Sequence, residues 1–260
     1  MGQIVVSGVG KVYQGDTPNP IIAVQDANLD IESGQFVTIV GPSGCGKSTL
    51  LHMIGGFIPA TSGEIRLNDR PVTEPGPERG IVFQHFALFP WLTVVRNVEY
   101  GLVEKGVPRN ERREIAQHYI DMVKLTGFED VFPNRLSGGM QQRVALARML
   151  ACDPEILLMD EPFGALDAQT RLIMQEELKE IWSESKKTVL FVTHDVREAV
   201  FLAQKVVVMS ARPGRIKEII DIDLADDAPR LAVDEKAEEI WDTLKEEVLK
   251  AVMPTGMGAQ

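Results

Sequence analysis

The sequence has few cysteines, no long apolar stretch and no excess of basic residues, and each absence excludes a class of protein. Cys45 and Cys152 are the two cysteines in 260 residues, so we expect no disulfide framework and a reducing compartment. No apolar run approaches the roughly 18–20 residues that cross a bilayer, and the N-terminal residues lack the features of a secretory signal. These absences predict a cytosolic protein.

The net charge of −11 argues against a partner with a phosphate backbone, so we expect no nucleic acid to bind. Much of the acidity lies near the C-terminus, where eleven Asp or Glu residues stand against three Lys or Arg between Asp221 and Glu247. We interpret residues 226–260 as an acidic helix and tail with one solvated face. The apolar residues on the other side predict that this helix docks on a core, and they are Ala237, Ile240, Trp241, Leu244 and Val248.

Hydrophobic patterns predict an α/β fold. Strands are expected at residues 3–13, 21–31, 36–40, 62–67, 80–83, 155–159, 188–192, 205–210 and 215–222. The first two are typical of an antiparallel β subdomain, because the second alternates in part between apolar and polar residues. Between residues 90 and 152 the period is helical, which indicates a helical subdomain inserted in the α/β core. Further helices are expected at residues 168–184 and 196–203.

A glycine-rich stretch follows the apolar strand 36–40 and precedes a helix, in the pattern Gly-x-x-x-x-Gly-Lys-Ser. Its glycines allow backbone N–H groups to converge on phosphate oxygens at a helix N-terminus. Lys47 adds a positive charge for the β- and γ-phosphates, and the Ser48 hydroxyl can bind Mg²⁺. The stretch predicts a nucleoside triphosphate site formed by Gly41, Pro42, Ser43, Gly44, Cys45, Gly46, Lys47, Ser48 and Thr49.

An acidic pair, Asp160 and Glu161, follows the apolar strand 155–159. Ligands gather at the carboxyl ends of parallel strands, and a carboxylate there can hold Mg²⁺ opposite Ser48. Glu161 points away from the direction of Asp160, which suits a general base that polarises water towards the γ-phosphate.

A second anion site is indicated by Leu136-Ser137-Gly138-Gly139. Ser137 is a candidate N-cap, and the two glycines expose N–H groups at the start of a helix. Because the first loop already holds the phosphates, two such sites for one ligand suggest a nucleotide sandwiched between two copies.

In their order along the chain these motifs resemble those of the ATP-binding subunits of ABC transporters, and the resemblance covers nearly the whole sequence. The phosphate loop matches Walker A, residues 136–139 the signature and residues 156–161 Walker B. Gln84 matches the Q-loop, Ala165-Leu166-Asp167 the D-loop and His194 the switch histidine. One departure is Met140, where the family commonly has Gln. The resemblance implies a P-loop NTPase (RecA-like) core and one nucleotide-binding domain over residues 1–225.

The resemblance also implies roles for single residues. Tyr13 would stack on adenine, although a Tyr packed on its own sheet is the alternative. His194 would contact the γ-phosphate, and Gln84 would join Ser48 and Asp160 at Mg²⁺. The signature in trans would comprise Ser137, Gly138, Gly139 and Gln141, with Asp167 in the D-loop. The ligands expected are therefore ATP and Mg²⁺, while Cys45, His52, His85 and His118 show no metal-ligand spacing.

Three segments resemble importers of nitrate, sulfonate, taurine and similar small anions: residues 89–94, 161–167 and 211–216. The partners implied are a second ATP-binding subunit, transmembrane permease subunits and an extracytoplasmic substrate-binding protein. Residues 86–92 would line a groove for a cytoplasmic helix of the permease. The protein would then lie peripherally at the cytoplasmic face of the inner membrane.

Two alternatives stay open. The first is a non-transport ABC ATPase that acts on chromosomes or ribosomes. Against it, 89 residues without heptads separate Lys47 from Ser137, and the chain has one cassette. The second is an importer subunit for another small solute.

Overall fold

The computed structural model describes residues 2–13, 20–84, 86–164, 166–225 and 229–252. These residues form two compact units, one of residues 1–76 with 186–260 and one of residues 77–185. The predicted helical block, residues 90–152, falls within the second unit. His85, Ala165 and parts of the predicted acidic tail lie outside the described residues.

The first unit contains an antiparallel sheet with the strand order β2-β1-β4-β5. Its strands are β1 (Ile4–Tyr13), β2 (Ile21–Ile31), β4 (Ser62–Leu67) and β5 (Arg70–Pro71). The central strand β1 pairs with both neighbours, so that Ile4 lies opposite Ile31 on one side and Leu67 on the other. The predicted N-terminal β subdomain is confirmed.

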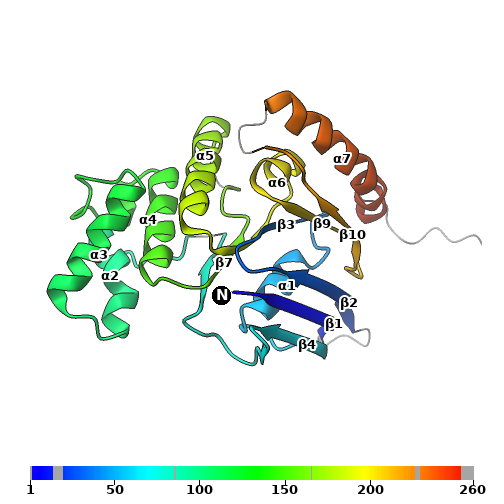
Figure 1. Cartoon of the computed structure of the whole chain (residues 1–260), viewed down its shortest axis with the longest axis horizontal. Helices are drawn as coiled ribbons and strands as arrows, with labels where there is room; N and C mark the ends of the chain where they lie inside the picture. The colour runs from blue at the N-terminus through cyan, green and yellow to red at the C-terminus, as the bar shows by residue number, and fades with distance from the viewer. Residues whose placement is uncertain (1, 14–19, 85, 165, 226–228, 253–260) are drawn as a thin grey trace, which may run out of the picture. The chain divides into compact units, whose positions relative to one another are not determined.

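A second sheet contributes strands to this unit in the order β10-β9-β3-β8. Figure 1 labels β10, β9 and β3 of this sheet. Its strands are β3 (Phe36–Val40), β8 (Thr188–Val192), β9 (Lys205–Met209) and β10 (Ile216–Asp221). The strand β3 is parallel to β8 and β9, whereas β10 pairs antiparallel at the edge. Every residue of β3 and β8 is buried, as expected for parallel strands covered on both faces. The carboxyl ends of these three parallel strands therefore share one edge.

Three helices complete the first unit: α1 (Lys47–Ile54), α6 (Val196–Leu202) and α7 (Arg230–Val252). The C-terminal helix α7 packs against α6 and β9 (Figure 1). Its docking face differs from the predicted one, because Trp241 is 45% exposed whereas Glu247 is 5% exposed. The buried positions Val233, Ala237, Ile240, Leu244 and Glu247 are spaced by three and four residues, and Trp241 stands one position outside that row.

The second unit contains the parallel strands β6 (Arg79–Val82) and β7 (Ile156–Asp160). Its helices are α2 (Val94–Glu104), α3 (Arg109–Met122), the short 3₁₀ helix η1 (Pro133–Arg135), α4 (Gly138–Ala151) and α5 (Ala168–Ser185). Helices α2, α3 and α4 pack against one another, and α4 also packs against β6 (Figure 1). The apolar positions Val94, Val95, Val98 and Leu102 are all buried in this packing.

Candidate nucleotide-binding site

The phosphate loop joins the end of β3 to the start of α1, as the sequence predicts. Gly44 and Gly46 have φ angles of 74° and 107°, which side-chain-bearing residues rarely adopt. A Cβ on Gly46 would also lie 2.6 Å from the carbonyl oxygen of Ala23. The first turn of α1 carries no acidic residue, so its positive end remains suited to an anion.

Lys47 begins α1 and is 5% exposed. Its Nζ donates to the carbonyl oxygens of Gly41, at 2.9 Å, and Pro42, at 3.1 Å. Among the described residues these are its two acceptors, and an ammonium group has three donors. One N–H therefore remains for a phosphate oxygen. Ser48 and Thr49 follow on the same turn and are half-buried.

Cys45 is 1% exposed inside this loop. A Cβ added to Gly41 would lie 2.8 Å from its Sγ, so the thiol fills space against the loop backbone. Burial raises the pKa of the thiol, and the nearby Lys47 and Arg212 offset this only in part. The geometry indicates a packing role for the side chain.

His194 follows β8, the strand that pairs with β3. The N–H of Thr193 donates to the carbonyl of Ile39 at 3.1 Å, which brings His194 beside the start of the phosphate loop. After it, Asp195 caps α6 by accepting from the N–H groups of Arg197 and Glu198 at 2.9 and 3.2 Å. The histidine is therefore held between a strand end and a capped helix.

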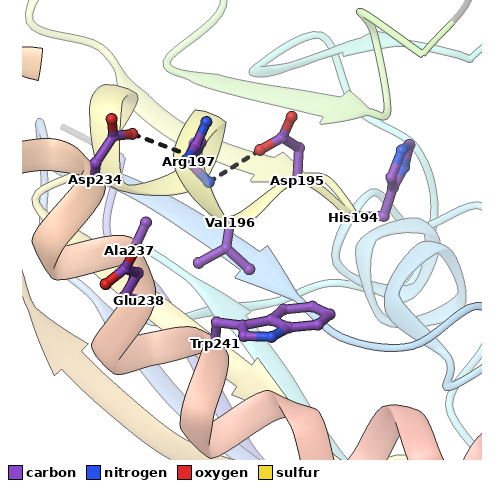
Figure 2. Close-up of a pocket in the computed structure, with 8 residues that line it drawn as sticks. All are labelled: His194, Asp195, Val196, Arg197, Asp234, Ala237, Glu238 and Trp241. Carbon is purple, nitrogen blue, oxygen red and sulfur yellow. Dashed lines mark hydrogen bonds and ion pairs between the residues drawn. The ribbon is translucent and has the colours of Figure 1, made fainter.

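His194 also lies at one end of a cavity of about 410 Å³ between α6 and α7 (Figure 2). Arg197 of α6 and Asp234 of α7 form an ion pair of 3.1 Å beside this cavity. The Trp241 ring lies next to Val196, on the side opposite the ion pair (Figure 2). The C-terminal helix thus forms one wall of the space next to the histidine.

Tyr13 ends β1 and is 38% exposed. Lys11 Nζ lies 5.2 Å from the centre of its ring and donates to the carbonyl of Pro59 at 2.7 Å. The ring is therefore partly accessible, and stacking on adenine stays a prediction.

The turn between β9 and β10, residues 210–215, lies against the phosphate loop, a contact that sequence reasoning missed. Arg212 donates from Nε and Nη2 to the carbonyl of Gly44, at 3.3 and 3.1 Å. Gly214 is placed so closely that an added Cβ would overlap the carbonyl oxygen of Cys45. The segment Ala211–Ile216 was noted in the sequence only because it resembles importers of small anions, and that resemblance did not indicate a contact with the phosphate loop.

In the second unit, Gln84 and Asp160 lie at the same edge of a parallel strand pair. Val82 of β6 is opposite Met159 of β7, so Gln84 follows one strand end and Asp160 closes the other. Asp160 is 6% exposed, whereas Gln84 is exposed. Two of the predicted Mg²⁺ ligands are therefore brought together here, and the third, Ser48, belongs to the other unit.

Glu161 has a φ of 44°, in the left-handed region that residues other than glycine seldom occupy. Such strain costs on the order of 1–3 kcal/mol and concentrates at functional sites. This bend lies directly after β7, so Glu161 does not continue the extended backbone of the strand. The division of roles between the two carboxylates stays a prediction.

The signature segment forms the N-terminus of the 14-residue helix α4. Ser137 caps this helix, with Oγ accepting from the N–H of Met140 at 3.3 Å, and both Ser137 and Gly138 are exposed. A Cβ added to Gly139 would lie 2.6 Å from Thr170. This helix end is accessible, and no acidic residue occupies its first turn.

Gln141 is half-buried, unlike Ser137 and Gly138, which are exposed. Its Nε2 donates to the carbonyls of Pro133, at 3.0 Å, and Leu136, at 3.2 Å. The side chain thus ties the first turn of α4 to the loop that precedes it. Any role at a nucleotide is then one of positioning Ser137.

Asp167 caps α5 by accepting from the Thr170 hydroxyl at 2.7 Å and from the N–H groups of Thr170 and Gln169 at 3.0 and 3.1 Å. These bonds, the one from the Thr170 hydroxyl first, hold the pKa of this exposed carboxyl below its ordinary value. The D-loop aspartate is therefore ionised and held in a defined orientation.

A groove of about 570 Å³ lies beside the segment that follows Gln84. Its lining includes Phe83, Ala87, Phe89, Tyr100, Arg148 and Cys152. The centres of the Phe89 and Tyr100 rings lie 4.4 Å apart with the rings tilted at 38°, and the Arg148 guanidinium lies 5.5 Å from the Phe89 ring centre. Burial lowers the pKa of Arg148. The groove thus combines apolar side chains with the cationic residues Arg79, Lys105 and Arg148 in its lining.

Two residues that sequence reasoning missed fix this segment. Arg148 donates to the carbonyls of Ala87, at 2.7 Å, and Phe86, at 3.1 Å. Asn97 is fully buried, accepts from the Phe89 N–H at 2.9 Å and donates to the carbonyls of Phe89, Leu92 and Thr93 at 3.0–3.2 Å. The groove wall is therefore ordered by its own hydrogen bonds.

The residues fit a nucleotide with Mg²⁺. The α1 end offers backbone N–H groups and Lys47 to phosphates, in a loop where added side chains would collide with the backbone. Hydroxyl, amide and carboxylate oxygens, from Ser48, Gln84 and Asp160, are the hard donors that Mg²⁺ prefers. The site residues thus suit both ATP and its metal.

Residues 24–164 match the sequence profile of the family described as ABC transporter. The chain is 50% identical over 222 residues to the nitrate import ATP-binding protein NrtD of Synechocystis sp., covering 85% of this chain and 83% of the relative. It is likewise 50% identical over 217 residues to the taurine import ATP-binding protein TauB of Yersinia pestis, covering 84% and 83%.

Two solved structures are also similar. The dimeric ATP-binding cassette MJ0796, in a post-hydrolysis state bound to ADP and Pi, has a TM-score of 0.75 and 36% identity, over 84% of this chain and 98% of the other. The protein cbiO1 from Clostridium perfringens, part of the ABC transporter complex cbiONQ, has a TM-score of 0.76 and 25% identity, over 96% and 98%.

An α/β fold with a phosphate loop and a signature helix defines the class as P-loop ATPases of the cassette type. The chain belongs to the ABC transporter family. Within it, this protein is an ATP-binding subunit, and an ATPase, related to the nitrate and taurine importers. The resemblance and the fold class predicted from the sequence are confirmed. No helix of the described residues has the length and apolar character to span a membrane.

Proposed function

We propose that this subunit powers an import system for a small anion, of the nitrate, sulfonate or taurine kind, by closing as a dimer on two ATP molecules. The observation that carries this proposal is the exposed N-terminus of α4 with Ser137 and Gly138. It is a second anion-binding helix end in a chain whose phosphate loop already provides one. A partner copy would present this end to the γ-phosphate of the nucleotide.

In each site the loop amides and Lys47 neutralise phosphate charge. Mg²⁺, held by Ser48, Gln84 and Asp160, would supply further charge neutralisation at the β- and γ-phosphates. Glu161 acts as general base and takes a proton from the attacking water. His194 holds the γ-phosphate from the adjacent strand end, and Tyr13 stacks on the adenine ring.

The groove beside Phe89 is proposed as the site for a cytoplasmic helix of the permease. Its apolar wall suits the apolar face of a short helix, and Arg148 and Asn97 hold that wall in place before binding. Trp91, 70% exposed and 5.7 Å from Phe89 between ring centres, extends the apolar surface. The subunit would then sit peripherally at the cytoplasmic face of the inner membrane.

The substrate class rests on the 50% identity to a nitrate and to a taurine import subunit. In such a system the permease and an extracytoplasmic binding protein select the anion. Purifying both together with this subunit, and screening the binding protein against nitrate, sulfonates and taurine, tests the class. Tight binding of a sugar or a cation in place of these anions would contradict it.

Glu161→Gln tests the mechanism. We expect it to retain ATP, to remain dimeric with ATP in gel filtration, and to lose turnover by about 10²-fold or more. Glu184→Gln, an exposed glutamate at the end of α5, is the control that keeps turnover. Turnover within a few-fold of the parent in Glu161→Gln would remove Glu161 as the base.

A mixing experiment tests the role of the signature in trans. Ser137→Arg blocks the α4 end, and Lys47→Ala disables the phosphate loop, so each variant alone should be inactive. In a mixed dimer one site pairs an intact phosphate loop with an intact signature. Recovered ATPase activity on mixing supports the sandwich, whereas a mixture that stays inactive although it forms dimers contradicts it.

A further inference from the structure

The C-terminal helix reaches the phosphate loop through a buried glutamate. Glu247 of α7 is 5% exposed, and its Oε2 accepts from the backbone N–H of Ala211 at 2.9 Å. Its Oε1 accepts from Lys250 at 2.7 Å and Lys217 at 3.3 Å. Both carboxylate oxygens are therefore used, one of them on the backbone of the turn that follows β9.

This turn, residues 210–215, is held by hydrogen bonds between its own two ends and by hydrogen bonds to β2. The Ser210 N–H donates to the carbonyl of Arg215 at 2.9 Å, and the Arg215 N–H donates back to the Ser210 hydroxyl at 3.0 Å. Gly214 exchanges backbone hydrogen bonds with β2, donating to Ala23 at 3.1 Å and accepting from Gln25 at 2.8 Å. A displacement at Ala211 is therefore transmitted to the whole turn.

At the other side of the turn, Arg212 and Gly214 contact the phosphate loop. Arg212 donates two hydrogen bonds to the carbonyl of Gly44, and Gly214 lies against the carbonyl of Cys45. Each carbonyl that points at the turn belongs to a peptide plane whose N–H points the opposite way. The N–H groups in these two peptide planes are those of Cys45, which donates to the carbonyl of Pro42 at 3.3 Å, and of Gly46. Contacts on the carbonyls of Gly44 and Cys45 thus hold the backbone of the phosphate loop in its observed conformation.

We propose that Arg212 and Glu247 are positioning residues for the phosphate loop: Glu247 fixes the turn, and Arg212 holds the Gly44 peptide so that the loop keeps the conformation that binds phosphate. The inference rests on the proposed role of the phosphate loop in holding ATP. Docking of α7 then contributes to nucleotide affinity, although the helix itself lies outside the nucleotide contacts proposed above.

The test measures the Kd for ADP by calorimetry, together with KM and kcat for ATP, on the full chain. Arg212→Gln and Glu247→Ala should each raise the ADP Kd and the ATP KM about 3- to 10-fold, since each removes roughly one net hydrogen bond from loop positioning. The kcat at saturating ATP should stay within about two-fold, because neither residue touches the reacting atoms. A purely structural role would lower thermal stability and leave the Kd unchanged, which would overturn the proposal.

Matched variants separate position from charge. Glu246→Ala removes the exposed neighbour on α7, whose nearest lysine contact is 4.0 Å, and should leave the Kd unchanged. Glu247→Gln keeps an acceptor for Ala211 and should stay within about two-fold of the parent. Arg212→Lys keeps the positive charge but loses the planar guanidinium group that donates two hydrogen bonds. We therefore expect its ADP Kd to resemble that of Arg212→Gln. Full affinity in Arg212→Lys would overturn the positioning role in favour of charge alone.

The coupling between the two residues is tested by the double variant. If they act in series, Arg212→Gln with Glu247→Ala should weaken ADP binding no more than the stronger single change does. Faster amide hydrogen exchange at residues 42–47 in Glu247→Ala would locate the effect in the loop, and unchanged exchange would count against it. If Glu247→Ala fails to fold, the ADP Kd of the Arg212 variants alone tests the proposal, because Arg212 is exposed.

Lys47→Ala separates this inference from the proposed function. If it abolishes ADP binding while Arg212→Gln and Glu247→Ala change nothing, the inference alone fails. If Lys47→Ala retains ADP binding, the phosphate loop is not the nucleotide site and both fail.

Discussion

The N–H of Thr193 donates to the carbonyl of Ile39 at 3.1 Å, and this bond joins the strand before the histidine to the strand before the phosphate loop. These two residues are 154 positions apart in the sequence, and they meet at one sheet edge because β3 and β8 are parallel neighbours. His194 thereby follows the carboxyl end of a central strand of the first unit.

His194→Ala should reduce ATP turnover about 10²-fold or more while ADP binds with a Kd within a few-fold of the parent. The physical reason is that the imidazole acts on the γ-phosphate, which ADP lacks. Single-turnover hydrolysis and calorimetry measure the two quantities. His118→Ala, an exposed histidine on α3, is the control, and equal losses in both variants would contradict the assignment.

Asn97→Ala should destabilise the protein by about 2–4 kcal/mol, because it removes a fully buried amide that pairs with the Phe89 N–H and the Leu92 carbonyl. Urea unfolding measures this loss. Asn134→Ala, an exposed residue of η1, should change the free energy of unfolding by less than about 0.5 kcal/mol. If the two variants are equally stable, Asn97 does not order the groove wall.

Cys45 should react slowly with iodoacetamide in the native protein. Burial raises the pKa of its thiol, so the thiolate fraction near pH 8 is smaller than for a free cysteine. Because the folded pKa lies above the unfolded one, folding gains stability below the ordinary thiol pKa and loses it as pH rises through the folded value. Mass spectrometry of the labelled protein follows the rate, and alkylation in the native state as fast as in urea would contradict the prediction.

We expect the Glu247 carboxylate to make a contribution to the free energy of unfolding that is lost in acid. Burial alone would raise its pKa, but hydrogen bonds from Lys250, the Ala211 N–H and Lys217 together hold it below the ordinary value. The stabilisation is therefore present above the ordinary carboxyl pKa, about 4.3, and is lost as pH falls through the lowered folded pKa. Glu246, which also faces Lys217, is the second acid in this cluster.

The measurement compares urea unfolding of the parent and Glu247→Gln. The parent should be the more stable at pH 7, and the difference should shrink as pH falls from about 5 to 3. A difference that is the same at every pH would mean that the charge of Glu247 is not what stabilises the helix.

Local patterns predicted the secondary structure well because they depend on neighbours in the chain. The glycine-rich stretch stood between an apolar strand and a helix, and the structure has β3 and α1 at those positions. The signature predicted a capped helix start, and Ser137 caps α4. The docking face of α7 was predicted less well, since Trp241 was expected on it but stands one position outside the buried row, whereas Glu247 lies in that row.

Contacts between distant segments could not be predicted in the same way. Nothing near Glu247 in the sequence indicates that its carboxylate meets Ala211, 36 residues earlier. The Arg212 contact with Gly44 spans 168 residues, and it exists because β9 pairs with β3. A buried Glu on an acidic helix has the same local pattern as a solvated one.

The sequence by itself determined the class of protein, since the residues that bind phosphate and activate water must occur at fixed spacings within short motifs. Only the tertiary structure decided which side chains hold those motifs in position. Three features hold them by contacts with distant segments: the turn at residues 210–215, the buried Asn97 and the docked Glu247. Strand order and helix packing determine the partners of these residues, and no local sequence pattern predicts either.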